Sequence, residues 1–141
     1  MGTKVDVSVD VALSEYDIKK KIDIAKKYYA SGEGISAVEV LEGILKHDPF
    51  NKKVLELVLE YIFDVWSGGT IVSAKPEIKK YINRLKSLTE TENDKKFVDE
   101  CEEYLNDSCN RYYCKLGFII GGGVIVYFLI LLLICLAVMW L

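Results

Sequence analysis

The sequence predicts an all-α protein: a short array of helical hairpins closed by a capping helix, with one transmembrane helix at the carboxyl end. Two observations support this prediction. Between residues 13 and 110, apolar side chains recur at steps of three and four, which is the period of amphipathic helices. Residues 116–141 contain no charged side chain, and about 20 apolar residues are enough to cross a bilayer as a helix.

The first expected hairpin has helices over Leu13–Ala30 and Ile35–Lys46. Ser14 can cap the first helix. The stretch Ser31–Gly34 separates the two helices, and Pro49 restricts the residue before it, so the second helix ends near this point. The apolar faces consist of Tyr16 or Ile18, then Ile22, Ala25 and Tyr29 in the first helix and Ala37, Val38, Leu41, Ile44 and Leu45 in the second.

The run Tyr28–Asn51 resembles a tetratricopeptide repeat, a unit of about 34 residues in which a helical hairpin is closed by proline. If Pro49 is that proline, the repeat spans Ile18–Asn51, and the family's signature positions hold Ile24, Ala25, Tyr28, Ala37, Leu41 and Pro49. Small residues at two of these positions allow the helices to approach closely. The sequence departs from the family pattern at Lys21, Gly34 and Ile44.

A second hairpin is expected after Asn51, which can cap a helix that continues to Ser67. Its apolar face consists of Val54, Leu55, Val58, Leu59, Ile62, Phe63 and Trp66, so we expect it to be the central helix. Residues 67–75 are predicted as a turn longer than the family's, and Pro76 as the first residue of the partner helix, because its missing N–H costs nothing there. Ile78, Ile82, Leu85 and Leu88 form the partner's face.

A last helix of the domain is expected from about Asp94, capped by Thr91 or Asn93. Its face holds Phe97, Val98, Cys101, Tyr104 and Leu105, and it would cover the open side of the second hairpin, as terminal helices of repeat arrays do. The predicted organisation is a flexible arm over 1–12, a helical domain over 13–110, a juxtamembrane linker over 111–115 and a transmembrane tail anchor over 116–141.

The charges around the tail predict its orientation. Arg111 and Lys115 precede the apolar run and no basic residue follows it, which is the pattern of a domain that stays in the cytosol. The glycosylation acceptor that begins at Asn106 should then remain unmodified. A long, strongly apolar tail favours the endoplasmic reticulum or another membrane of the secretory pathway, with the mitochondrial outer membrane second.

Composition argues against several classes of function. The formal net charge is −3 with both signs interspersed, so no nucleic-acid-binding surface is expected. The single histidine, His47, and the four cysteines are not spaced as metal ligands are, and the sequence has no phosphate-binding loop motif. We therefore expect no enzyme activity, no cofactor and no metal.

Candidate binding residues lie on the faces predicted to point into the groove of the array: Lys26, Tyr29, Lys53 and Leu57. Helix-in-groove or extended-peptide binding would use such a surface. The alternative for the lysines is that they are solvated side chains on exposed faces.

Two further features concern the tail. Gly117 and Gly121, with Gly122 and Gly123 beside them, would allow a second transmembrane helix to approach closely, either in a homodimer or in a larger membrane complex. Cys109 and Cys114 are juxtamembrane cysteines, where reversible palmitoylation is possible; the alternative is that they are ordinary small residues.

The layout is similar to that of the mitochondrial and peroxisomal fission adaptor family and of tail-anchored import receptors. This resemblance implies a tail-anchored adaptor that binds a protein partner in its cytosolic groove and tethers it to an organelle membrane. The alternative is a small structural subunit of a membrane complex for import, insertion or fission, held through its transmembrane helix. The chain departs from the fission adaptors at its end, where Trp140 and Leu141 stand in place of their basic residues.

Overall fold

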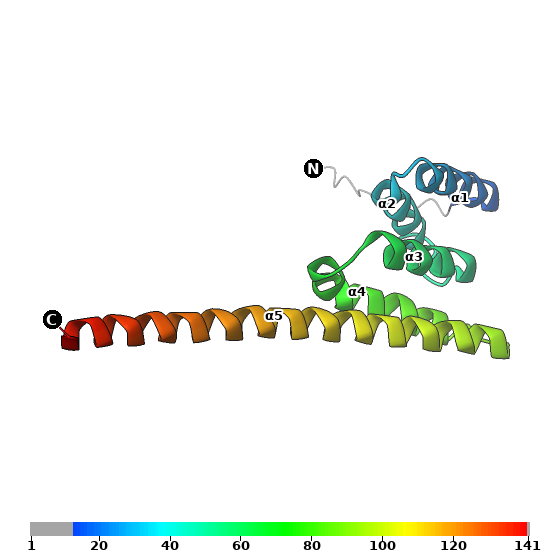
Figure 1. Cartoon of the computed structure of the whole chain (residues 1–141). Helices are drawn as coiled ribbons and strands as arrows, with labels where there is room; N and C mark the ends of the chain where they lie inside the picture. Colours follow the sequence, from blue (N-terminus) through cyan, green and yellow to red (C-terminus); the bar gives the residue numbers. More distant parts are fainter. Residues whose placement is uncertain (1–12, 141) are drawn as a thin grey trace, which may run out of the picture.

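The computed structural model describes residues 13–140, with side chains to residue 136, and this part of the chain contains five helices and no strand (Figure 1). The helices are α1 (Glu15–Ala30), α2 (Gly34–Leu45), α3 (Lys52–Val65), α4 (Gly69–Lys86) and α5 (Glu92–Trp140). Each helix packs on the next along the chain, and α5 extends far beyond the other four. The all-α prediction is confirmed. The predicted arm, 1–12, lies outside the described residues.

The α1–α2 hairpin forms where the sequence predicts it. Ser14 caps α1: its hydroxyl oxygen accepts a hydrogen bond from the Asp17 backbone N–H at 3.2 Å, which satisfies one of the free donors of the first turn. Gly32 makes the turn with a φ of +85°, a conformation that residues with a Cβ rarely adopt. Ala25 and Ala37 are both completely buried, so the small residues on the two helices lie inside the packed hairpin.

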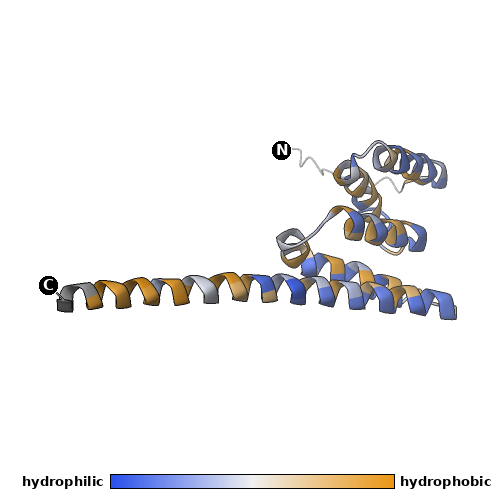
Figure 2. Cartoon of the chain, in the orientation of Figure 1, coloured by the Kyte–Doolittle hydropathy of each residue, from blue (hydrophilic) through white to orange (hydrophobic). Residues whose placement is uncertain are grey.

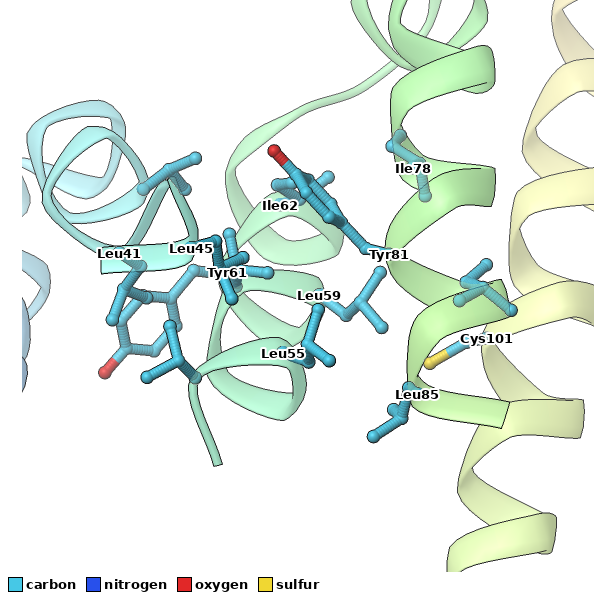
Figure 3. Packing of buried hydrophobic residues seen from close by; sticks show 14 of the residues in the cluster. Leu41, Leu45, Leu55, Leu59, Tyr61, Ile62, Ile78, Tyr81, Leu85 and Cys101 are labelled. Atoms are coloured by element: carbon cyan, nitrogen blue, oxygen red, sulfur yellow. The ribbon is translucent and has the colours of Figure 1, made fainter. Parts of the chain in front are cut away.

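Helix α3 lies at the centre of the core, as its apolar face predicts. The Asn51 side chain accepts a hydrogen bond from the Val54 backbone N–H at 3.2 Å and caps the helix. Figure 3 shows α3 side chains between those of α2 and α4, with Cys101 of α5 beyond them. The completely buried residues of α3 are Val54, Leu55, Val58, Leu59 and Ile62.

Helix α4 begins earlier than predicted. It starts at Gly69, so Pro76 lies inside the helix, and both the long turn over 67–75 and the placement of Pro76 at the helix start are wrong. An interior proline costs about 3 kcal/mol because it removes a backbone hydrogen bond. The added residues bring Ile71 into the core, where it is 1% exposed and in register with Ile78 and Ile82. Burial of one such side chain contributes about 1.5–3 kcal/mol, comparable to that cost.

Helix α5 is continuous from the head into the apolar run (Figure 2). Thr91 caps it by accepting a hydrogen bond from the Asp94 backbone N–H, and the Asp94 carboxylate accepts one from the Thr91 backbone N–H. Val98, Cys101, Leu105 and Cys109 form its buried face against α4. The segment 111–115, expected as a linker, continues the helix without a break.

Candidate functional site

Aromatic and polar contacts join α1 to α3. The rings of Tyr29 and Tyr61 stack with centroids 4.0 Å apart and planes 3° from parallel. The Tyr29 hydroxyl donates a hydrogen bond of 2.6 Å to the Asp64 carboxylate, and this bond raises the pKa of Tyr29 to about 12. These contacts hold the first and third helices side by side.

Similar contacts join α3 to α5. The Lys52 ammonium group lies 2.7 Å from the Asp94 carboxylate, and the Phe63 and Tyr104 rings have centroids 4.9 Å apart. The Tyr104 hydroxyl also donates a hydrogen bond of 3.3 Å to the Phe63 carbonyl. Helix α3 therefore has side-chain contacts with both α1 and α5.

A polar contact also joins α2 to α4. The Tyr81 hydroxyl donates a hydrogen bond of 3.1 Å to the Glu42 carboxylate across these two helices. Burial of Tyr81 and the nearby Glu42 carboxylate both raise the pKa of the Tyr81 phenol. Side-chain contacts thus join alternate helices of the head as well as neighbouring ones.

A groove of about 280 Å³ lies between α1 and the start of α3. Its apolar part comes from Ile18, which is half-buried, and Ile22, which is buried. Lysines dominate the charged part, with three lysines against two carboxylates. The groove is lined by Glu15, Ile18, Lys19, Ile22, Asp23, Lys26, Asn51 and Lys53.

Two of the four predicted binding residues line this groove and two lie elsewhere. Lys26 and Lys53 are exposed and belong to it. Tyr29 is half-buried in the stack with Tyr61, and Leu57 is partly buried against the core. Both of these side chains therefore pack against the core, and neither lines the groove. Lys19 also lines the groove, and the sequence places it among several lysines that could make one surface basic and attract an acidic peptide: Lys19 to Lys21, Lys26, Lys27, Lys52 and Lys53.

The apolar half of α5 is exposed along the isolated chain. Every side chain from 113 to 136 is exposed, and α5 is the one helix of the described residues that is long and apolar enough to cross a membrane. The portion from Leu116 to Trp140 is about 37 Å long at 1.5 Å per residue. A bilayer core is about 30 Å thick, so this portion is sufficient to span it.

The predicted tail residues have distinct surroundings. A Cβ built on Gly117, Gly121, Gly122 or Gly123 would meet no atom within 4 Å, so packing within this chain does not require glycine at these positions. The two candidate acylation sites differ, because Cys109 is 1% exposed and Cys114 is exposed. An acyl group on Cys109 would require α4 and α5 to separate, whereas one on Cys114 would not.

The remaining candidate groups for chemistry are dispersed. His47 is exposed at the end of α2, and burial raises the pKa of the Cys101 thiol to about 12. Within residues 13–136, no three His, Cys, Asp or Glu side chains come together in a group that could hold a metal ion.

Comparisons with protein-family models, with curated proteins and with solved structures found no match to this chain.

Proposed function

We propose that the protein is a membrane-tethered adaptor that binds a segment of another protein in the groove between α1 and α3. The groove itself is the observation that carries this proposal. It combines an apolar surface, formed by Ile18 and Ile22, with cationic side chains around it. If these side chains formed only a flat, solvated face, there would be no hollow between the helices. If this were a purely structural contact between α1 and α3, side chains of the same chain would fill the space.

The groove favours a partner segment of defined chemistry. Apolar side chains of the segment would cover Ile18 and Ile22, because burying such surface supplies most of the binding free energy. Acidic side chains beside them would meet Lys19, Lys26 and Lys53, whose positive charges outnumber the two carboxylates of the groove. The proposed ligand is therefore an amphipathic segment with apolar anchors and acidic flanks.

The arrangement of the helices supports a repeat-like head. Tetratricopeptide arrays place the first helix of each hairpin in one row and the second in another, and present the first row to ligands. The contacts from α1 to α3, from α3 to α5 and from α2 to α4 are those expected of such rows. The groove lies on the first row, at the end of the head remote from the apolar run (Figure 1).

Helix α5 would act as the tether, crossing the bilayer once with the head in the cytosol. Arg111 and Lys115 on the head side of the apolar run support this orientation. The last buried residue of the head, Cys109, is about 10 Å along the helix from Leu116. The head would thus be held close to the membrane and would carry a partner at its far end, with the endoplasmic reticulum favoured by the strongly apolar tail.

Site-specific photocrosslinking in cells tests this function. A photoreactive residue at Lys53 of the full-length chain should capture a discrete protein partner, and the same residue at Lys79, exposed on α4, should not. The charge reversal Lys26→Glu should reduce capture at position 53, and Lys79→Glu should leave it unchanged. Equal capture from both positions, or capture unaffected by Lys26→Glu, would exclude the groove as the binding site.

A second candidate is a small structural subunit of a membrane complex, held through α5. The glycines of α5 favour it, because they leave room that this chain does not use. The variant Gly117→Leu/Gly121→Leu separates the two functions. If the protein is a structural subunit, this variant should no longer co-purify with its complex. If the protein is an adaptor, the variant should still capture its partner through the photoreactive residue at position 53.

A further inference from the structure

A hollow of about 240 Å³ lies where the head meets the apolar half of α5. One wall is the connection from α3 to α4 and the first turn of α4, and the other wall is α5. The Tyr112 ring lies against the first wall: a Cβ built on Gly69 would be 3.4 Å from its hydroxyl oxygen. The hollow is lined by Ser67, Gly68, Ile71, Tyr104, Ser108, Arg111, Tyr112 and Lys115.

The lining carries positive charge and hydrogen-bond donors. It contains two cations and two serine hydroxyls but no carboxylate, although the chain has 21 acidic and 18 basic residues. Four other hollows in the described part of the chain each include at least one carboxylate. The ion pairs formed among residues 13–136 do not include Arg111 or Lys115. Their charges are therefore available to an anion.

The position of the hollow indicates where that anion would come from. Arg111 and Lys115 are four residues apart on α5, so they lie on the same side of the helix, and Lys115 directly precedes the apolar run. If Leu116 begins the part of α5 in the hydrocarbon core, the residues just before it lie at the level of the lipid headgroups. The hollow then opens onto the layer in which phosphate groups are concentrated.

We propose that this hollow binds the phosphate headgroup of an anionic phospholipid from the bilayer that α5 crosses. The Arg111 guanidinium can donate two parallel hydrogen bonds to phosphate oxygens, and Lys115 adds a second positive charge. The Ser67 and Ser108 hydroxyls are further donors in the same lining. The inference rests on membrane insertion of α5, which is part of the proposed function, and is independent of the groove between α1 and α3.

The test uses the full chain reconstituted in nanodiscs of equimolar phosphatidylcholine and phosphatidylserine. Native mass spectrometry of the released protein measures the ratio of the two lipids that stay bound, and phosphatidylserine should be enriched. A basic side chain near an anionic leaflet contributes about fivefold in binding, so the loss of two in Arg111→Gln/Lys115→Gln should lower the enrichment by on the order of 25-fold. Both residues are exposed, so the core should remain intact.

Two further variants separate a built site from general attraction to a charged surface. Lys95→Gln/Lys96→Gln removes two exposed cations from the same helix outside the hollow and should leave the enrichment unchanged. Ser108→Phe keeps Arg111 and Lys115 but fills the hollow, and it should lower the enrichment.

Several results would overturn the proposal. These are full enrichment in Arg111→Gln/Lys115→Gln, full enrichment in a folded Ser108→Phe protein, and failure of the chain to enter nanodiscs. Inorganic phosphate tests the source of the anion: compared with chloride at equal ionic strength, it should leave the enrichment unchanged. Displacement of the lipid by phosphate would instead assign the hollow to a soluble anion. Crosslinking at Lys53 is a separate readout, so failure of one proposal does not imply failure of the other.

Discussion

A tight contact between α2 and α3 involves Gly34, the first residue of α2. A Cβ built at this position would overlap the Val65 side chain, with one methyl carbon in direct clash and two further side-chain carbons at 3.4 Å. Only the one methyl group clashes, and rotating it away would take Val65 out of the χ1 rotamer that a helix strongly favours. Gly34→Ala must therefore either force Val65 into a disfavoured rotamer or push α2 and α3 apart. Gly43, in the same helix, has no atom within 4 Å of its Cβ position and is the matched control.

The two substitutions should change stability in opposite directions. Alanine at Gly43 should stabilise the protein by about 0.5–1 kcal/mol, because it favours the helical backbone over glycine. At Gly34 that gain is opposed by an overpacking cost of about 1–3 kcal/mol. The expected net effect of Gly34→Ala is a loss of about 1 kcal/mol, and at most about 2.5 kcal/mol. In a Val65→Ala background the obstructing methyl groups are absent, so Gly34→Ala should then be neutral or stabilising.

Urea unfolding of the full chain in detergent micelles measures these effects. Trp66 follows Val65 directly, so its fluorescence reports on this contact once the second tryptophan is removed by Trp140→Phe. The reasoning fails if Gly34→Ala is as stable as Gly43→Ala. It also fails if the loss from Gly34→Ala persists undiminished in the Val65→Ala background, because the two residues would then be uncoupled.

Three further predictions concern cysteines and the Lys52–Asp94 ion pair. In the native protein, iodoacetamide at pH 8 should modify the exposed Cys114 and spare Cys101, whose buried thiol has a pKa of about 12; peptide mass spectrometry would show this. If the tail is palmitoylated in cells, the palmitoylation signal of an acyl-exchange assay should disappear in Cys114→Ser and persist in Cys109→Ser, because Cys109 is 1% exposed. The hydrogen bond from Lys52 and those from backbone N–H groups hold the Asp94 pKa below its ordinary value of 3.8, so the stability it contributes is present above that value and is lost as the pH falls below it. The difference in urea midpoint between the wild type and Asp94→Asn should accordingly be largest near pH 7 and shrink towards pH 3, and a constant difference would contradict this assignment.

The features predicted correctly from sequence are those that depend on neighbouring residues. Ser14, Asn51 and Thr91 each cap the helix that follows, because a side-chain oxygen at that position reaches a backbone N–H three residues on. Ala25 and Ala37 are buried as expected, because their place in the apolar pattern fixes the face that they occupy. The presence of each helix, and the face that it turns towards the core, follow from such local information.

The errors arose where a tertiary contact overrides a local preference. Proline favours the first turn of a helix, yet burial of Ile71 extends α4 backwards past Pro76. The stacking of Tyr29 on Tyr61 was not predicted either, because Tyr61 lies 32 positions away in sequence and on another helix. No local pattern identifies that partner. For the same reason, the hollow beside Arg111 could not be found before the start of α4 was placed against α5.

The continuity of α5 links these surfaces. Val98, Cys101 and Leu105 fix one part of the helix in the core, and the same helix continues unbroken into the apolar run. An unbroken helix resists bending, so the head would hold a defined orientation to the bilayer, unlike a head on a flexible linker. The start of α4 would then face the headgroup layer beside Tyr112, while the groove between α1 and α3 would face away from it. An anion bound between Arg111 and the α4 start would reinforce that orientation, because it contacts both the helix that crosses the membrane and the head that it carries.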